Sequence, residues 1–242
     1  MNKTILIVGD PAGNHTLAAL RKYSAESIAV WESPSNHYTI HQISDKILVT
    51  DDLQTLIDQG MKFDYIVGNP PYNNGLSVKF INKCAELSDH IHFVLPKAIR
   101  KPSQLNRIDP RLHIVKDVDC ESGTFIGAGD IPAVVQKFEK RDYDRPKIET
   151  YTTHPDFVFV KKSENPDLMI GRSGCGPTGK VLTENFSHYR DDHYYIKVNE
   201  PKVVDTLKGL TSKFREAASQ SRMMSLSKHE TITIYNETLN CR

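Results

Sequence analysis

The segment FDYIVGNPPY, residues 63–72, decides the fold and locates the first candidate site. Its apolar first part predicts a buried parallel strand, and two consecutive prolines cannot continue a hydrogen-bond ladder. The strand therefore ends with Asn69 at its carboxyl end, the edge of an open α/β sheet where ligands bind. Each proline fixes its own φ angle, and Pro71 also restricts Pro70, so we expect a stiff loop that holds the Asn69 carboxamide beside the Tyr72 ring. That pair suits a planar substrate with an amino group. The alternative is a simple proline turn in which Asn69 caps the next helix.

The remaining N-terminal sequence alternates β-rich runs with helical segments. Past Pro96 this alternation gives way to two strands without a long helix between them. Alternating units followed by a strand pair predict a parallel sheet with a reversed strand near one edge. The expected strands are 5–9, 27–32, 46–50, 63–68, 92–96, 112–115 and 132–138, with helices over 15–20, from 51, and over 77–87.

Asn69-Pro70-Pro71-Tyr72, preceded by Asp64-Tyr65-Ile66-Val67-Gly68, resembles the motif of the amino-methyltransferases, which use S-adenosylmethionine to methylate exocyclic nitrogens. The resemblance implies an α/β, Rossmann-like class I methyltransferase fold: a seven-stranded, mostly parallel sheet with a small carboxyl-terminal appendage. It also implies that Asn69 Oδ1 and the Pro70 carbonyl accept hydrogen bonds from the amine, and that Tyr72 stacks on the base. These bonds localise the nitrogen lone pair for in-line attack on the sulfonium methyl, with no metal required.

The resemblance places S-adenosylmethionine across the carboxyl ends of the first three strands. The loop 9–15 is similar to the family's D-P-x-x-G-x-G loop, although it is shorter and has His15 where a second glycine is usual. A simple strand-to-helix turn is the alternative. Glu32 would bind the ribose hydroxyls, or be solvated; Asp51 would accept from the adenine amino group, unless Asp52 does so or caps the helix. The expected cofactor-binding residues are Gly9, Asp10, Pro11, Gly13, Glu32, Asp51 and Asp52.

In such enzymes a helix usually precedes the first strand and closes over the cofactor. The first strand begins too early in this sequence to follow one. We therefore expect donor binding to be weakened, or to be completed by a later segment, a partner subunit or a second copy.

The expected catalytic domain spans residues 1–145, and residues 146–242 are expected to form a DNA-recognition region with a hairpin and a helix over 201–219. Residues 174–180 fit the P-loop pattern G-x-x-x-x-G-K, but Val181 replaces the residue that binds magnesium and no helix follows. A hairpin with a glycine-rich tip is the better interpretation.

By resemblance to phage and bacterial adenine methyltransferases, basic residues of the carboxyl-terminal third face DNA. Phe125 is a candidate second stacking aromatic, and a core phenylalanine is its alternative. Each basic residue could equally be solvated. The expected substrate contacts are Phe125, Lys97, Arg100, Arg172, Lys180 and His188, with Arg215, Arg222 and Lys228 as extensions of that surface.

Composition neither supports nor excludes DNA as the partner. The chain of 242 residues has 38% hydrophobic and 25% charged residues and a net charge of +1, so a DNA-binding surface would have to be local. The 4 cysteines lie far apart with no C-x-x-C pair, which disfavours a zinc site or a disulfide framework. Without a long apolar run or a secretory signal, the expected location is the cytoplasm, that of the host if the protein is phage-encoded, and no membrane partner is expected.

We therefore predict a site-specific DNA methyltransferase that methylates N6 of adenine in double-stranded DNA after base flipping. Adenine is preferred because cytosine-N4 enzymes more often carry Ser-Pro-Pro and the opposite motif order. One alternative is methylation of an RNA base or a protein glutamine. Another is a non-catalytic methyltransferase fold that binds DNA or a partner subunit.

Overall fold

The computed structural model describes residues 4–9, 28–31, 48–50, 53–72, 75–121, 132–174, 177–186, 192–220 and 224–240. The chain forms two compact units, Met1–Ile148 and Glu149–Arg242. The first unit extends past residue 145 because the following segment is bonded to it. Arg145 donates a side-chain hydrogen bond to the Ile108 carbonyl at 3.1 Å, and the Asn106 side chain pairs with the backbone of Ile148 at 2.8 and 2.9 Å.

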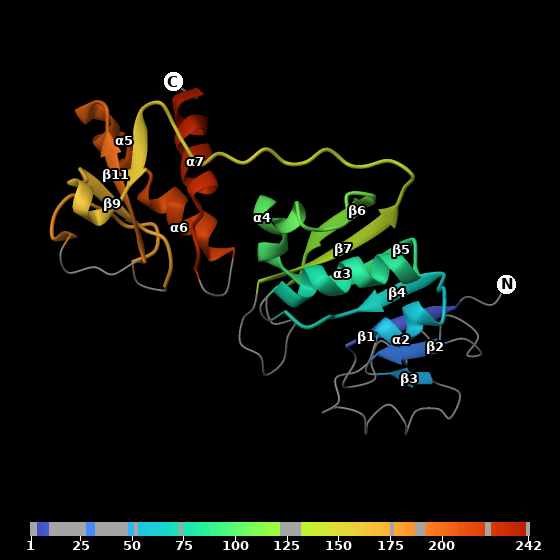
Figure 1. The fold of residues 1–242 in the computed structure, drawn as a ribbon. Helices are drawn as coiled ribbons and strands as arrows, with labels where there is room; N and C mark the ends of the chain where they lie inside the picture. Colours follow the sequence, from blue (N-terminus) through green and yellow to red (C-terminus); the bar gives the residue numbers. More distant parts are fainter. Residues whose placement is uncertain are drawn as a thin grey trace. The chain divides into compact units, whose positions relative to one another are not determined.

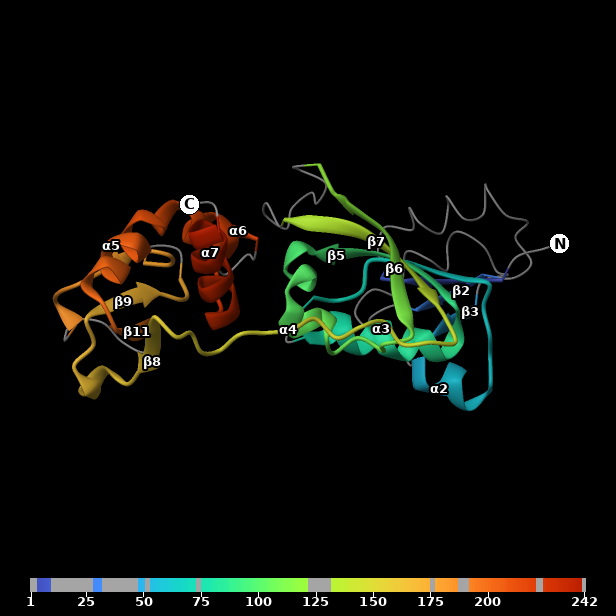
Figure 2. The ribbon, with the colours of Figure 1, turned by 90° about the horizontal axis from the view of Figure 1, so that it is seen from above.

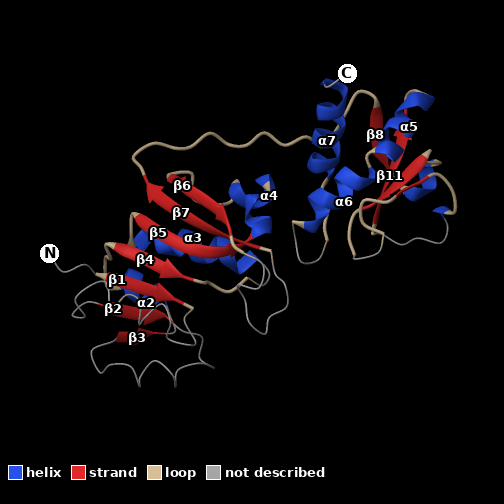
Figure 3. Ribbon diagram, turned by 180° about the vertical axis from the view of Figure 1, so that it is seen from behind, coloured by secondary structure: helices blue, strands red, loops and turns tan. Residues whose placement is uncertain are grey.

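The first unit is built on a mixed sheet in the order β3-β2-β1-β4-β5-β7-β6 (Figures 1 and 3). Strands β3, β2, β1, β4 and β5 are parallel, whereas β7 is antiparallel to both β5 and β6. The predicted reversed strand near one edge is therefore confirmed. The strands are β1 (Ile5–Val8), β2 (Ile28–Trp31), β3 (Leu48–Thr50), β4 (Tyr65–Gly68), β5 (His90–Pro96), β6 (Leu112–Asp119) and β7 (Ala133–Lys140).

The strand order reverses at β1. From β1 the chain proceeds outward to β2 and β3, and it then returns to pair β4 with the other side of β1. Open α/β sheets bind ligands in the crevice outside the carboxyl ends of the strands at such a switch point. In this sheet those ends are Val8 of β1 and Gly68 of β4.

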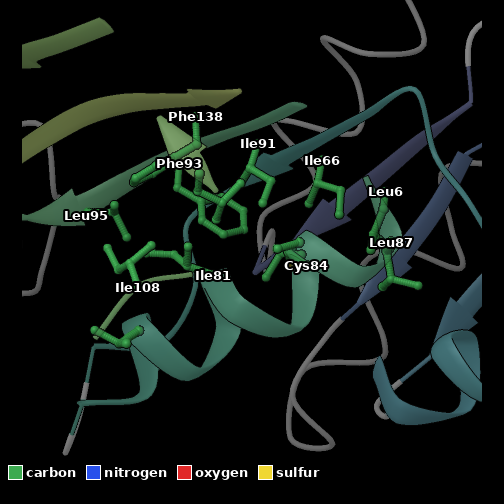
Figure 4. Packing of buried hydrophobic residues seen from close by; sticks show 14 of the residues in the cluster. Leu6, Ile66, Ile81, Cys84, Leu87, Ile91, Phe93, Leu95, Ile108 and Phe138 are labelled. Carbon is green, nitrogen blue, oxygen red and sulfur yellow. The ribbon is translucent and has the colours of Figure 1, made fainter. Parts of the chain in front are cut away.

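Helices α2 (Leu53–Asp58), α3 (Leu76–Leu87) and α4 (Pro102–Leu105) lie on one face of this sheet (Figure 2). The apolar residues of α3 recur at intervals of three and four, which gives the helix one buried side. Ile81, Cys84 and Leu87 of α3 point toward apolar side chains of β1, β4, β5 and β7 (Figure 4). Because Cys84 is fully buried there, the pKa of its thiol is raised and the thiol stays protonated.

Strand β6 is longer than expected. It runs through Asp119 instead of ending at residue 115, with a register shift against β7 between Ile114 and Lys116. The extra residues, 116–119, are exposed and mostly charged, so a search for buried apolar runs does not detect them. Asp117 and Asp119 are consequently strand residues.

The second unit contains an antiparallel sheet in the order β10-β9-β11-β8 and helices that bury its core. The pairing of β9 with β10 confirms the predicted hairpin. The elements are β8 (Phe157–Val160), β9 (Leu168–Gly171), β10 (Val181–Leu182), β11 (His193–Val198), α5 (Pro201–Gly209), α6 (Thr211–Ser219), α7 (Lys228–Asn240) and the short 3-10 helix η3 (Lys162–Glu164).

The single helix expected over residues 201–219 is wrong, because α5 and α6 are separate. Leu210 leaves helical geometry with φ −91° and ψ 2°, and its side chain is buried in the core of the unit. Gly209 before it has no side chain to stabilise a continuing helix. Helix α7 was not predicted at all. Among the residues that the structure describes, no helix has the length and apolar character to cross a membrane.

Candidate active site

The ends of β1 and β4 are joined backbone to backbone. The Asn69 N–H donates to the Val8 carbonyl at 2.8 Å. A Cβ atom on Gly68, whose φ is +148°, would lie 1.9 Å from Val8 O. A Cβ atom on Gly9, whose φ is +67°, would lie 2.2 Å from the backbone oxygen of Asn69. Any side chain at Gly9 or Gly68 would therefore force these strand ends apart.

This junction brings together two predicted site residues, Gly9 of the expected cofactor loop and Asn69 of the catalytic motif. They lie at the switch point of the sheet, where ligands are expected. We call the pair of strand ends, with Gly9, Gly68 and Asn69, the β1–β4 junction.

The Tyr72 side chain turns back toward the β1–β4 junction. Its hydroxyl donates to Asn69 Oδ1 and also lies 3.2 Å from the Val94 carbonyl oxygen of β5. Burial, and to a lesser degree the nearby Cys120, raise the pKa of this phenol. Tyr72 therefore stays a neutral hydrogen-bond donor at physiological pH.

The proline loop is fastened to the helix that follows it. The Ser77 hydroxyl donates to the Pro71 carbonyl at 3.3 Å, and Ser77 is buried in the first turn of α3. The residue at the N-cap of α3 is Gly75, with φ 74° and ψ 15°. The interpretation of Asn69 as a helix cap is therefore wrong, and its carboxamide oxygen accepts from Tyr72 instead.

Lys97 and Arg100 lie in the 3-10 helix η2 (Lys97–Arg100), directly after β5, where they face the carboxylates of β6. Lys97 Nζ lies 2.7 Å from Asp119 Oδ2. Arg100 forms ion pairs of 2.6 Å with Asp117 and 2.5 Å with Asp119. Two cations thus face two carboxylates, so a DNA phosphate would have to compete with existing ion pairs at this edge.

These ion pairs shift the pKa values of Arg100 and of the two aspartates. The hydrogen bond that Arg100 donates to Asp117, foremost, raises the pKa of Arg100. Burial alone would raise the pKa of Asp117, but hydrogen bonds from Arg100 and Gln136 outweigh it and the pKa is lowered. Hydrogen bonds from Lys97 and then Arg100 lower the pKa of Asp119. Arg100, Asp117 and Asp119 are therefore ionised at neutral pH.

The glycine-rich segment between β9 and β10 is packed against its own unit. Thr178 is fully buried, and its hydroxyl donates to the Gly174 carbonyl and lies 3.0 Å from Met224 O. A Cβ atom on Gly171 would lie 2.0 Å from Pro177 O, and one on Gly179 would lie 2.7 Å from the Arg215 nitrogen of α6. Strand β10 follows Lys180, so the P-loop interpretation is excluded, as predicted.

Arg172 belongs to a group that we call the cation–aromatic cluster. Its guanidinium carbon lies 5.7 Å from the centroid of Tyr194, whose ring meets Phe159 edge-on at 5.3 Å. Lys228 Nζ lies 4.7 Å from the Phe159 centroid. The sequence indicated the two cations, but not the aromatic residues, because Phe159 and Tyr194 come from separate strands. Lys180 is exposed and lies outside this cluster.

The other predicted site residues lie outside the described residues, so their roles stay predictions. They are Asp10, Pro11, Gly13, Glu32, Asp51, Asp52, Phe125, His188 and Arg222. In the described part of the chain, no group of three or more His, Cys, Asp or Glu side chains could hold a metal ion.

The sequence matches no protein-family profile and no curated protein. Solved structures do resemble the fold. A Thermoplasma acidophilum protein is 17% identical with a TM-score of 0.46, over 59% of this chain and 77% of that one. A proposed RNA methyltransferase of Pyrococcus horikoshii is 17% identical with a TM-score of 0.46, over 57% and 75%. TrmN from Thermus thermophilus is 15% identical with a TM-score of 0.47, over 58% of this chain and 44% of its own.

The mixed sheet with its helices fits a Rossmann-like α/β fold. Asn69 and Gly9 lie at the carboxyl edge of that sheet, with the hydroxyl of Tyr72 bonded to Asn69.

Proposed function

We propose that this protein is an S-adenosylmethionine-dependent methyltransferase that acts on N6 of adenine in double-stranded DNA. The observation that carries the proposal is the β1–β4 junction. There a glycine loop start and an Asn-Pro-Pro-Tyr motif meet backbone to backbone at the switch point of the sheet.

The cofactor site follows from the position of Gly9. Gly9 begins the loop at the carboxyl end of β1, where open α/β sheets bind ligands at the switch point. In this proposal Gly9, Asp10, Pro11 and Gly13 bind the methionine part of the donor, Glu32 the ribose, and Asp51 or Asp52 the adenine. Bound S-adenosylmethionine supplies an electrophilic methyl group on its sulfonium.

The chain's own residues prepare the nucleophile. The Asn69 carboxamide oxygen and the Pro70 carbonyl accept the amine N–H bonds and so draw the lone pair out of conjugation with the ring. The stiff proline loop, fastened to α3 through Ser77, keeps these acceptors in place. Catalysis of this kind rests on positioning and on fixed dipoles.

The target adenine cannot reach a sheet edge while it is stacked in a duplex, so the proposal includes base flipping. The Tyr72 ring would stack on the extruded base, a contact worth about 1–3 kcal/mol. The cation–aromatic cluster of the second unit supports a nucleic-acid partner, because its cations suit phosphates and its rings suit exposed bases. Lys180 and His188 would extend that contact, with Lys97, Arg100 and Phe125 on the first unit.

The test is transfer of a radiolabelled methyl group from S-adenosylmethionine to unmethylated DNA, RNA and protein. We expect label in DNA as N6-methyladenine, loss of transfer in Asn69→Ala, and full transfer in Asn199→Ala, which removes an exposed amide of the second unit. Label in RNA or protein instead would show that DNA is not the substrate, while methyl transfer from S-adenosylmethionine would still hold. Failure to bind S-adenosylmethionine with DNA binding intact would show a non-catalytic DNA-binding protein and overturn the proposal.

A further inference from the structure

The Tyr72 hydroxyl occupies the acceptor that the proposed chemistry gives to the substrate. Asn69 Oδ1 is the oxygen assigned to the amino group of the target base, and it already accepts a hydrogen bond from Tyr72. A substrate amine must therefore break this bond before it can take its place. The free energy needed to break the Tyr72–Asn69 hydrogen bond therefore lowers the affinity of any ligand that binds to Asn69 Oδ1.

A second acceptor lies beside the same hydroxyl. Strand β4 pairs with β5 as far as Gly68 opposite Phe93, and the Val94 carbonyl is one residue beyond that last pair. Its oxygen lies 3.2 Å from the Tyr72 hydroxyl. A hydroxyl has one proton and can satisfy one of the two oxygens fully, whereas a primary amine has two N–H donors. The Val94 carbonyl thus lies beside Asn69 Oδ1 as a second acceptor for a primary amine, and in this pose it takes the N–H bond assigned above to the Pro70 carbonyl.

We propose that the Tyr72 hydroxyl is a placeholder for the substrate amine. It holds Asn69 Oδ1 and the Val94 carbonyl until a primary exocyclic amine displaces it, after which the Tyr72 ring is available to stack on the base. A base without such an amine would break the Tyr72–Asn69 hydrogen bond without donating a hydrogen bond to either oxygen in its place. Tyr72 thus selects substrates with a primary amine, and the inference rests on the proposed function.

A purely structural role for the hydroxyl predicts the opposite effect of its removal. If the hydroxyl only fastened the motif to β5, Tyr72→Phe would loosen Asn69 and weaken binding of a base. If it is a placeholder, Tyr72→Phe leaves both acceptors open and strengthens that binding. The sign of the change in affinity separates the two roles.

The experiment is a titration of adenosine into the full chain, followed by ligand-observed NMR. Tyr72→Phe should bind adenosine about two- to tenfold more tightly than the wild type, because one hydrogen bond of ordinary net strength no longer competes. Tyr143→Phe is the matched control, since it removes an exposed hydroxyl that accepts a hydrogen bond from Arg141 at 2.6 Å; its affinity should equal that of the wild type. In an Asn69→Ala background, Tyr72→Phe should give no gain.

A second measurement does not depend on a variant. In wild-type protein with isotope-labelled tyrosine, saturating adenosine should shift the Tyr72 ring resonance as its hydroxyl changes partner. Unchanged or weaker adenosine binding by folded Tyr72→Phe, including no detectable binding by either protein, overturns the placeholder. So does a Tyr72 resonance that adenosine leaves unmoved.

Binding of S-adenosylmethionine and methyl transfer are measured on the same wild-type samples. Tighter adenosine binding by Tyr72→Phe, with no S-adenosylmethionine binding, would keep the placeholder and overturn methyl transfer. Methyl transfer by the wild type, with weaker adenosine binding by Tyr72→Phe, would support the proposed function and overturn the role of the Tyr72 hydroxyl as a placeholder.

Discussion

Two glycine-containing segments, one in each unit, allow equally close backbone contacts, but these contacts have different roles. At the β1–β4 junction a Cβ on Gly9 would lie 2.2 Å from Asn69 O, and in the second unit a Cβ on Gly171 would lie 2.0 Å from Pro177 O. The first contact joins two strand ends at the open edge of a sheet. The second closes the glycine-rich loop onto its own strand, and Gly179 packs that loop on α6. Glycine therefore reports close backbone approach, and only the place in the fold tells whether a ligand is served.

The largest effect is expected at the β1–β4 junction. Gly9→Ala must displace the Asn69 backbone, and a shift of about 1 Å near reacting groups can lower a rate about a hundredfold. We expect methyl transfer to fall by that order, measured with labelled S-adenosylmethionine. Gly60→Ala is the matched control: its φ of +68° equals that of Gly9 closely, but no atom lies within 4 Å of its Cβ. Transfer by Gly9→Ala within a few-fold of that by Gly60→Ala would contradict a functional junction.

The second-unit loop should respond in stability and not in donor binding. Gly179→Ala combines a positive φ with a Cβ 2.7 Å from the Arg215 nitrogen, and it should lower the free energy of unfolding by about 2–4 kcal/mol. Denaturant unfolding checks the loss, and calorimetry with S-adenosylmethionine should show unchanged affinity. A weakened donor affinity would mean that the two glycine segments are not separate in function.

The ion pairs between η2 and β6 lie at the end of β5. Removing one of them tests how far charges, as opposed to backbone contacts, stabilise this part of the sheet edge. Asp117→Asn should lower the free energy of unfolding by about 1 kcal/mol, because both partners are partly exposed. The pKa of Asp117 is lower in the folded than in the unfolded chain, so its stabilisation is present above the unfolded value near 4 and is lost as pH falls through the folded value. Denaturant unfolding from pH 3 to 7 should therefore show the wild type approaching the variant in acid. Parallel curves would contradict the assignment.

The smallest effect is expected where a glycine has neither contact nor strain. Gly209 ends α5 without a positive φ, and no atom lies within 4 Å of its added Cβ. Gly209→Ala should raise the thermal midpoint slightly, by a gain of about 0.5 kcal/mol in helix stability. A loss of stability would show that the break at Leu210 needs the glycine.

The sequence predicted the parts of the fold that depend on buried apolar runs. The strands of the first unit, the reversed β7 and the β9–β10 hairpin follow from such runs and from turn residues. Helix α7 was not predicted, although a capping box in the sequence indicates where it begins. The Ser227 hydroxyl accepts from the Glu230 N–H at 3.1 Å, and the Glu230 carboxylate accepts from the Ser227 N–H at 2.7 Å.

The candidate site was only partly predictable. The motif and its place at a strand end were visible in residues 63–72, because proline chemistry is local. The contact of Gly9 with Asn69 depends on pairing between strands far apart in the sequence, and the Tyr72–Asn69 bond depends on a rotamer that no pattern specifies. Pairing of Lys97 and Arg100 with aspartates was hidden because β6 was expected to end before Asp117.

The pairing of β1 with β4 has a consequence for the order of events during synthesis. The Thr4 backbone N–H donates to the Asp64 carboxylate across a separation of 60 residues, and Ile5 pairs with Tyr65. A ribosome-bound chain that exposes β1 alone lacks this neighbour, and contacts of such long range form late in folding. Gly9 and Asn69 come together only in the same step. A nascent chain released before β4 emerges therefore has neither the centre of its sheet nor the place where two ligands would meet.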